Sequence, residues 1–243
     1  MSTSRVTGLF YGPPLADGDH RTLEIVTALE AAVPGVRLDH VVTSAGTAGA
    51  LPDRDAFLRE ASARREFPFV FHGDEARYVG VRGREPPAIL MPARQAMLEV
   101  WVTLPLAEPV ASLAEAVGQI GNAARASWGA ASPIAAAATI ALQIMFAGRP
   151  LPAGLPGLLP PDKLLDPLVP HCLGWLNYWS ERTAHELGFP DGARDAVLLQ
   201  RSLRIGNAWV VRLTDEPLDL ERDDHRALLR DIYDRFPAIG GRV

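Results

Sequence analysis

The segment from Met97 to Leu106 limits the possible folds of this chain more than any other, because its hydrophobic side chains recur at every second position. These side chains are Leu98, Val100, Val102, Leu104 and Leu106. Successive side chains of an extended strand point to opposite faces, so these five share one face. The pattern predicts a β-strand whose hydrophobic face lies against a core.

Shorter segments on either side of this strand alternate between strand and helix patterns. Further strands are expected at Val6–Tyr11, Val36–Thr43, Phe67–Phe71, Arg77–Arg82 and Asn207–Thr214. Helices are expected after the capping residues Asp19 and Asp53, after a capping box formed by Ser112 and Glu115, up to Leu187, over Ala193–Arg204 and from about Asp223. The alanine-rich run Ser132–Ala147 fits either a buried helix or a strand. We therefore predict an α+β protein with a mixed, largely antiparallel sheet and helices packed on it.

The segment Pro150–Pro170 differs from its surroundings because it holds seven of the 21 prolines. Proline removes backbone donors and resists regular structure, which predicts an irregular crossover. The segment also carries seven leucines. These favour a loop packed on the body of the protein over a domain boundary, so residues 1–243 are expected to form a single compact α+β domain.

Composition and charge argue against several classes of protein. The formal net charge is −5, whereas a nucleic-acid-binding surface needs clustered positive charge. The single cysteine, Cys172, excludes an intrachain disulfide framework and a multi-cysteine zinc site. The longest apolar run, Ile134–Ala147, is shorter than the roughly 20 residues that span a bilayer. The start of the sequence lacks the apolar region of a signal peptide. We expect a cytoplasmic protein with no membrane or nucleic-acid partner.

A search for catalytic motifs yields no candidate site. The sequence has no glycine-rich phosphate loop and no Gly-x-Ser-x-Gly elbow, and its six histidines are scattered. His171 and Cys172 are adjacent, but neighbouring helical side chains do not face each other, and Cys172 is expected to be a small buried apolar residue. The chain is therefore expected not to be an enzyme and to use no cofactor or metal.

The stretch from Asp215 to Asp224 is strongly acidic. It contains one arginine and six carboxylates, namely Asp215, Glu216, Asp219, Glu221, Asp223 and Asp224. A calcium loop would need glycine at the sharp turn, where Leu220 stands instead. The stretch fits either a solvated connection to a helix N-terminus or a docking surface for a basic partner.

Aromatic residues gather in the stretch from Gly174 to Ser180. Trp175, Tyr178 and Trp179 fall within five residues of a chain that has five tryptophans and four tyrosines. On a helix, Trp175 would share a face with both Tyr178 and Trp179. Such a stripe fits a hydrophobic core or an interface anchor.

Several of these motifs together resemble immunity protein 52 and its relatives, which belong to bacterial polymorphic toxin systems used in bacterial competition. The resemblance is strongest from about Trp128 onward. It rests on Ser127-Trp128-Gly129 with Ser132-Pro133, Gly174-Trp175-Leu176-Asn177-Tyr178-Trp179-Ser180, Gly188-Phe189-Pro190, Trp209, Leu213-Thr214-Asp215-Glu216-Pro217-Leu218-Asp219 and Phe236-Pro237-Ala238-Ile239-Gly240-Gly241.

The resemblance implies an α+β protein that binds and neutralises a cognate toxin encoded nearby, often a nuclease of restriction-endonuclease fold. It implies no catalytic residues. The motif residues expected to be structural are Trp128, Gly174, Trp175, Tyr178, Trp179 and Trp209. The residues expected to bind the toxin are Asp215, Glu216, Asp219, Glu221 and Asp224, because an acidic surface steers association with a basic nuclease.

The alternative is a small-ligand-binding or enzymatic domain whose site is assembled from distant residues, such as His72, Asp74 and Glu75. A buried pocket with several convergent polar groups would favour that alternative.

Overall fold

The strand predicted most firmly from the sequence is present as β6 (Leu98–Pro105) in the computed structural model, which describes residues 5–43, 46–74, 77–106, 110–145 and 154–242. Leu98, Val100, Val102 and Leu104 are all buried on one face of this strand. The alternation therefore identified both the strand and the face that meets the core.

The strands of the described residues form one ten-stranded sheet in the order β3-β2-β4-β5-β6-β1-β7-β8-β10-β9. Each neighbouring pair runs antiparallel. The remaining strands are β1 (Arg5–Gly12), β2 (His40–Val42), β3 (Ala48–Ala50), β4 (Val70–Phe71), β5 (Gly80–Arg84), β7 (Trp128–Pro133), β8 (Leu176–Trp179), β9 (Leu203–Ile205) and β10 (Ala208–Arg212).

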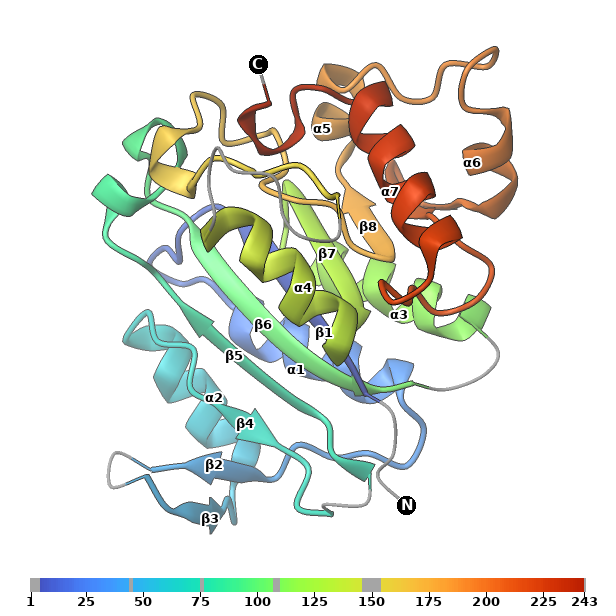
Figure 1. Cartoon of the computed structure of the whole chain (residues 1–243). Helices are drawn as coiled ribbons and strands as arrows, with labels where there is room; N and C mark the ends of the chain where they lie inside the picture. Colours follow the sequence, from blue (N-terminus) through green and yellow to red (C-terminus); the bar gives the residue numbers. More distant parts are fainter. Residues whose placement is uncertain (1–4, 44–45, 75–76, 107–109, 146–153, 243) are drawn as a thin grey trace.

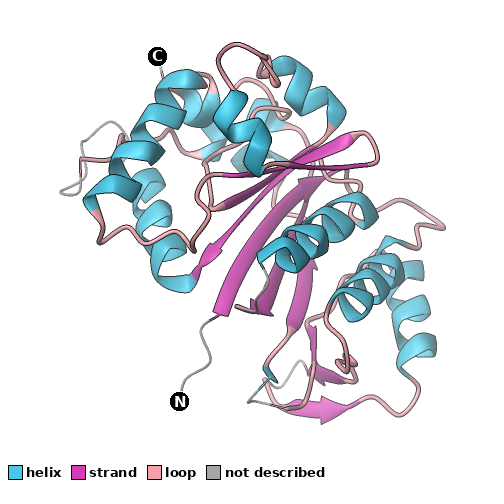
Figure 2. Ribbon diagram, turned by 90° about the vertical axis from the view of Figure 1, so that its right-hand side faces the viewer, coloured by secondary structure: helices cyan, strands magenta, loops and turns pink. Residues whose placement is uncertain are grey.

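Helices cover both faces of the sheet (Figures 1 and 2). The α-helices are α1 (Arg21–Ala32), α2 (Arg54–Ala63), α3 (Val110–Ala123), α4 (Ile134–Met145), α5 (Glu181–Glu186), α6 (Ala196–Arg201) and α7 (Asp223–Arg235). Helices α4 and α7 lie in front of the sheet in Figure 1, and α1 and α3 lie behind it. The predicted α+β class, with an antiparallel sheet in one compact domain, is confirmed.

Most of the predicted elements exist, but several are shorter than expected. Only His40–Val42 of the strand expected over Val36–Thr43 pairs in the sheet, as β2. The helix expected over Ala193–Arg204 is divided between α6 and the edge strand β9. These differences arise because local patterns mark potential for strand or helix, while pairing with distant strands decides which residues join the sheet.

The predicted helix caps were right at Asp53 and wrong at Asp19 and Ser112. The Asp53 carboxylate accepts a hydrogen bond from the Ala56 backbone N–H, as expected of a cap. Asp19 lies one residue before the N-cap of α1 and pairs with Arg21 instead. Ser112 lies inside α3, which already begins at Val110, so the proposed capping box is wrong.

The helix predicted through the aromatic stretch is also wrong at its start. Leu176–Trp179 form β8, and α5 begins only after Ser180, whose hydroxyl accepts a hydrogen bond from the Thr183 backbone N–H. Trp175 and Trp179 therefore do not share a helical face. Bulky aromatic residues suit a strand between two others, and β8 pairs with both β7 and β10.

The structure also shows which conformation the alanine-rich run and the proline-rich segment adopt. The alanine-rich run is mainly helical, as α4, after the end of β7 at Pro133. The proline-rich segment is irregular from residue 154 onward apart from a 3-10 turn at Pro161–Lys163, and its first four residues lie outside the described part. Leu155, Leu158 and Leu164 are buried, whereas Leu165 is exposed. The described part of this loop is therefore held on the body of the protein by three of its leucines.

Candidate functional site

One row of side chains crosses the sheet on the face that α4 and α7 cover. The register of seven consecutive strands places these residues directly opposite one another. In spatial order, the row consists of Arg84, Glu99, Tyr11, Trp128, Trp179, Trp209 and Arg204. The centre of the row is aromatic, and an arginine stands at each end.

The first end of the row contains a hydrogen-bonded polar group. The Tyr11 hydroxyl donates to Oε1 of Glu99 at 3.0 Å, and Nε of Arg84 donates to Oε2 of Glu99 at 2.5 Å. Glu99 is almost completely buried, whereas Arg84 is largely exposed. Burial, followed by the charge of Glu99, raises the pKa of Tyr11 well above its usual range. Both Tyr11 and Arg84 therefore stabilise a buried carboxylate.

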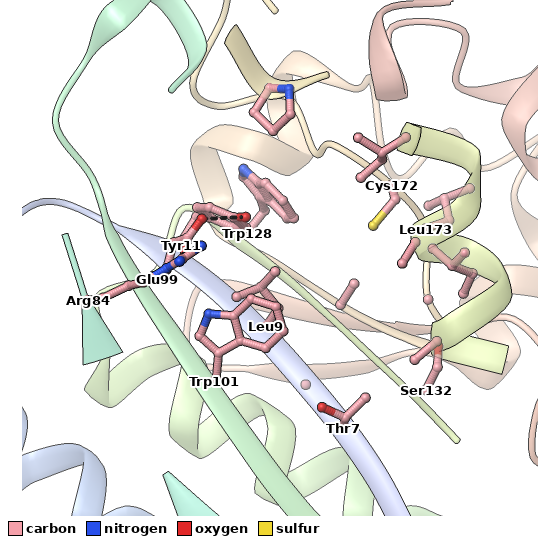
Figure 3. Close-up of a pocket in the computed structure, with 18 residues that line it drawn as sticks. Thr7, Leu9, Tyr11, Arg84, Glu99, Trp101, Trp128, Ser132, Cys172 and Leu173 are labelled. Atoms are coloured by element: carbon pink, nitrogen blue, oxygen red, sulfur yellow. Dashed lines mark hydrogen bonds and ion pairs between the residues drawn. The ribbon is translucent and has the colours of Figure 1, made fainter. Parts of the chain in front are cut away.

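A cavity of about 310 Å³ lies beside this group, under α4 (Figure 3). Its floor comes from β1, β6 and β7, because Leu9, Trp101 and Ala130 project from the same face as the aromatic row. Its other walls come from α4 and from the loop before β8. Those walls include Ala137, Ile140, Ala141, Ile144, Cys172 and Leu173. The cavity is mainly apolar, with the Tyr11–Glu99–Arg84 group at one side.

Two buried hydrogen-bond donors belong to residues that line the cavity. Nε1 of Trp101 and Nε1 of Trp128 have no hydrogen-bond partner among the described residues. An indole N–H can only donate, so it needs an acceptor such as a carbonyl, hydroxyl or carboxylate oxygen. Both nitrogens are enclosed by surrounding atoms and have almost no accessible surface, so the accessible walls of the cavity are mainly apolar.

The neighbouring His171 and Cys172 are both held uncharged. The His171 ring packs against Tyr11 and Trp128, with ring centroids 4.7 and 4.6 Å apart. Burial lowers the pKa of His171 to about 3 and raises the pKa of the Cys172 thiol to about 12. Cys172 is half-buried rather than fully buried, because it lines the cavity. Neither residue has the charge state of a thiolate–imidazolium pair.

The local sequence patterns did not predict this cavity. Its hydrogen-bonded polar group comes from three strands, of which β1 is distant in the chain from the consecutive strands β5 and β6. Only the register brings Tyr11, Glu99 and Arg84 together. One signal was present, since Glu99 and Trp101 occupy the face of β6 opposite the buried aliphatic residues. A charged and an aromatic side chain on that face indicate a second, partly polar environment.

Four of the five predicted toxin-binding carboxylates lie in the connection between β10 and α7, and Asp224 lies in the first turn of α7. All five are exposed, and residues 215–224 together are called the acidic loop. Buried Leu218 and Leu220 hold the loop against the core. The Asp219 backbone N–H donates to Nδ1 of His225, and Arg226 donates to the carbonyls of Leu220 and Glu221. The structure therefore gives this acidic loop a defined conformation.

Arginines pair with several carboxylates of the acidic loop. Arg222 bridges Glu216 and Asp224 at 2.6 and 2.7 Å, and its hydrogen bonds lower the pKa of Asp224 to about 2. Asp215 pairs with Arg201 and Arg212 at 3.2 and 3.0 Å.

Asp223 pairs with Arg226. Among the described residues, Asp219 and Glu221 are the carboxylates of this loop without an ion pair.

The aromatic motif residues lie inside the protein, with one partial exception. Trp128, Trp175 and Trp179 are buried, as is Tyr178, whereas Trp209 is half-buried. Nε1 of Trp175 donates to the Thr214 carbonyl at 3.0 Å. This bond ties the start of β8 to the beginning of the acidic loop.

Gly174 has a packing role in the same region. A Cβ at this position would lie 3.0 Å from the backbone N and O of Ala131. Its backbone N–H donates to the Asn177 side chain at 2.8 Å. A side chain would therefore crowd the contact between the segment before β8 and β7.

Comparison with known proteins identifies the family. Residues 17–243 match the family described as "Domain of unknown function (DUF5953)". The chain belongs to the DUF5953 family. A search of curated proteins gives no match.

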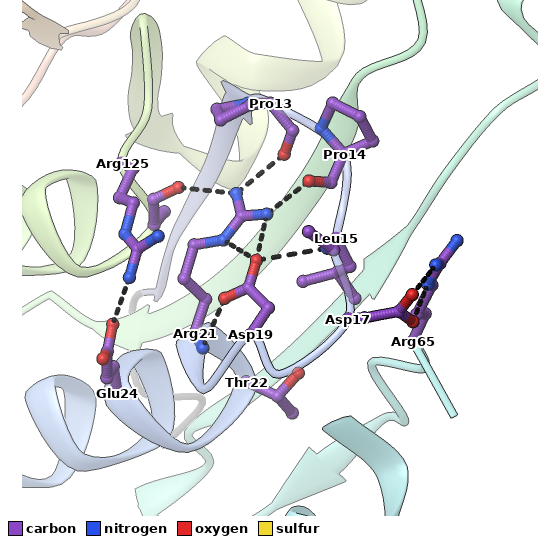
Figure 4. Close-up of polar contacts among 12 residues, drawn as sticks. Pro13, Pro14, Leu15, Asp17, Asp19, Arg21, Thr22, Glu24, Arg65 and Arg125 are labelled. Carbon is purple, nitrogen blue, oxygen red and sulfur yellow. Dashed lines mark hydrogen bonds and ion pairs between the residues drawn. The ribbon is translucent and has the colours of Figure 1, made fainter. Parts of the chain in front are cut away.

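A second polar cluster in the DUF5953 chain is structural (Figure 4). The buried Arg21 guanidinium pairs with Asp19 and donates to the carbonyls of Pro13 and Pro14. Although burial opposes ionisation of Asp19, hydrogen bonds from Arg21 lower its pKa to about 2. With its charge and donors satisfied by the protein, this cluster fixes the connection from β1 to α1.

The alternative site suggested by His72, Asp74 and Glu75 lies only partly in the described residues of the DUF5953 chain. His72 borders a different hollow with His40 and Tyr78, and its Nδ1 lies 2.9 Å from the Arg37 carbonyl. Glu75 lies outside the described residues.

Metal-binding and membrane-spanning features are not found in the described part of the DUF5953 chain. No group of three or more histidine, cysteine or carboxylate side chains there is placed to hold a metal ion. None of the helices in that part has the length and hydrophobicity needed to cross a bilayer.

Proposed function

We propose that this DUF5953 protein is an immunity protein that binds and neutralises a cognate polymorphic toxin, and that the toxin is a nuclease of restriction-endonuclease fold. The observation that carries the proposal is the acidic loop, in which Asp215, Glu216, Asp219, Glu221 and Asp224 are exposed together. The resemblance of the aromatic and acidic motifs to immunity protein 52 supports the same function.

The conformation of the acidic loop suits recognition by a folded partner. Leu218 and Leu220 are buried beneath it, and Arg226 holds its backbone carbonyls. A surface that is ordered before association loses less conformational entropy on binding than a mobile one. The anchored loop can therefore present its carboxylates in one arrangement.

The ion pairs divide the acidic residues into two groups. Asp215, Glu216 and Asp224 have arginine partners within the protein, so they contribute mainly to the shape of the loop. Asp219 and Glu221 have none in the described part of the chain. These two carboxylates are the ones we expect to contact basic groups of the toxin and to accelerate its association.

A kinetic experiment tests this assignment. The double variant Asp219→Asn/Glu221→Gln removes two charges, and its first substitution keeps the side-chain oxygen that accepts the backbone N–H of residue 221. The matched control is Glu60→Gln/Glu115→Gln, which removes two exposed carboxylates from α2 and α3. Association with the toxin encoded by the neighbouring gene is measured by surface plasmon resonance at low salt and near 1 M salt.

We expect the Asp219/Glu221 variant to associate about tenfold more slowly than the wild type at low salt. The difference should shrink near 1 M salt, where the screening length is about 3 Å. The control variant should associate at nearly the wild-type rate. Equal slowing in both variants would indicate a general charge effect and would remove the acidic loop from the proposal. Failure of the wild type to bind or inhibit the neighbouring toxin would reject the immunity function itself.

The cavity under α4 favours a second candidate function, the binding of a small molecule. The supporting observation is the convergence of Tyr11, Glu99 and Arg84 beside an apolar space lined by Trp101 and Trp128. Such a combination of apolar walls and a few polar groups is typical of ligand sites.

A further inference from the structure

We propose that the cavity under α4 binds a small carboxylate with an apolar body, and that the carboxylate group lies against the arginine side chains at the edge of the cavity (Figure 3). This ligand class rests on the second candidate function, the binding of a small molecule, and is independent of toxin binding. The acidic loop follows β10, and none of its residues lines the cavity.

The accessible walls of the cavity determine the apolar part of the ligand. Leu9 and Trp101 line it from the sheet, and Ile140 and Ile144 line it from α4. No charged residue occurs in the sequence of α4. The volume of about 310 Å³ is at the lower end of the roughly 300–1,000 Å³ of small-molecule sites. The cavity therefore suits a single ring or a short alkyl chain.

Arg84 provides accessible hydrogen-bond donors at one side of the cavity. Its Nε donates to Oε2 of the buried Glu99, and the Tyr11 hydroxyl donates to Oε1 of the same carboxylate. The Arg84 side chain is nevertheless 64% exposed. A guanidinium has five N–H donors, and no described residue accepts a hydrogen bond from the two terminal nitrogens of Arg84. These nitrogens are free to bind a ligand carboxylate.

Arg82 places a second positive charge at the same edge. It lies two residues before Arg84 on β5, so both side chains project from the same face of the sheet. Its guanidinium lies 5.4 Å from the centre of the Trp101 ring, which lines the cavity and is half-buried. Arg82 is exposed and has no ion pair within the described part of the chain. Together with Glu99, the two arginines leave one net positive charge at this edge.

A carboxylate matches this edge better than a cationic or a neutral group does. The planar guanidinium of an arginine binds the two oxygens of a carboxylate through parallel hydrogen bonds. An ammonium group would be repelled by the net charge, and both oxygens of Glu99 already accept hydrogen bonds. A neutral amide has the same shape as a carboxylate but does not neutralise the charge. The apolar body of the ligand excludes water nearby, which strengthens the ion pair.

Four probes test this chemistry by isothermal titration calorimetry on the full chain. The carboxylate is 3-phenylpropionate, and 3-phenylpropanamide is its neutral counterpart of the same shape. The third probe, 3-phenylpropylammonium, carries a positive charge, and acetate lacks the apolar body. We expect 3-phenylpropionate to bind with a Kd of about 1 mM or tighter, consistent with its small number of atoms. The other three probes should bind at least about tenfold more weakly.

Arginine variants test the polar contact. Arg82→Gln should weaken 3-phenylpropionate binding several-fold. The double variant Arg84→Gln/Glu99→Gln should weaken it by at least about tenfold, although it keeps the net charge of the edge and leaves no buried carboxylate without its partner. Arg59→Gln is the matched control, because it removes an exposed arginine from α2. This control should keep the wild-type affinity.

Two further variants test the apolar contact. Ala137 and Ala141 line the cavity from α4, so Ala137→Phe and Ala141→Phe should each abolish binding by filling the space. Thermal unfolding shows which variants are folded, and Ala141→Phe provides the test if Ala137→Phe is not.

Different results would overturn different parts of the assignment. Equal affinities of the wild type for 3-phenylpropionate and 3-phenylpropanamide would reject the carboxylate and leave small-molecule binding in place. No binding of any of the four probes would reject the second candidate function as well. Unchanged 3-phenylpropionate binding in the cavity-filling variants would reject the cavity as the site. Unchanged binding in both arginine variants, or equal weakening in Arg59→Gln, would reject the arginine contact.

Discussion

His171 should make the stability of the protein decrease in mildly acidic solution. Its ring is buried between Tyr11 and Trp128, and burial lowers its pKa from 6.5 to about 3. In the unfolded chain the imidazole takes up a proton below about pH 6.5, whereas in the folded protein it stays neutral until about pH 3. Because the unfolded state binds more protons in this range, the free energy of unfolding falls as the pH falls.

The size of the effect follows from the two pKa values. Between pH 8 and pH 5, protonation of one histidine with a pKa of 6.5 stabilises the unfolded state by about 2 kcal/mol, since each pH unit below the pKa contributes about 1.4 kcal/mol. Carboxylates with lowered pKa values, such as Asp19 and Asp224, act mainly below about pH 4. The interval from about pH 6.5 to pH 5 therefore isolates His171 from these carboxylates.

The assay is urea denaturation of the wild type and His171→Phe at several pH values. The variant keeps an aromatic ring but cannot take up a proton. The free energy of unfolding of the wild type, relative to the variant, should fall by about 2 kcal/mol from pH 8 to pH 5. His185→Gln, at a residue whose side chain is 87% exposed, should follow the wild type. Parallel curves for the wild type and His171→Phe would refute the assigned burial of a neutral imidazole.

Three further predictions test the packing and the buried polar groups. Gly121→Ala should destabilise the protein by about 1–2 kcal/mol in urea denaturation, because the new Cβ would lie 2.4 Å from the Tyr178 ring. The control Gly192→Ala should leave the stability nearly unchanged, because there is open space around Gly192. Asp195→Ala should lower the free energy of unfolding by about 3 kcal/mol in the same assay, because Arg235 loses its two hydrogen bonds of 2.8 and 3.0 Å to this buried carboxylate. A decrease below about 1 kcal/mol would contradict this role. Iodoacetamide at pH 8 should alkylate Cys172 about a hundredfold more slowly in the folded protein than in urea, because a pKa of about 12 leaves little thiolate. Similar rates in the two states would show that the folded thiol ionises normally.

The sequence predicted those features that depend on neighbouring residues. The alternation along β6 and the cap at Asp53 are local, and both were right. The stretch Trp175–Trp179 was misread because aromatic residues at this spacing fit a helix as well as a core strand. Its conformation depends on pairing with β7 and β10, which are distant in the chain.

In the two candidate sites as well, residues that are close in sequence could be predicted, whereas contacts between distant segments could not. The acidic loop is continuous in sequence, so its residues could be named, but its arginine partners Arg201 and Arg212 come from α6 and β10. The cavity required the order and register of β1, β5, β6 and β7, which no local pattern encodes. For this reason Tyr11, Glu99 and Arg84 were not recognised as a group.

The central position of β1 has a consequence for synthesis on the ribosome. Arg5 pairs with Pro105, and Val6 pairs with both Leu104 and Pro133. Translation at about 5–20 residues per second separates these partners by roughly 5–25 s. During that interval the nascent chain exposes Val6 and Phe10, which are fully buried in the finished protein. This strand is therefore a candidate binding site for chaperones that recognise short hydrophobic segments before the middle of the sheet can close.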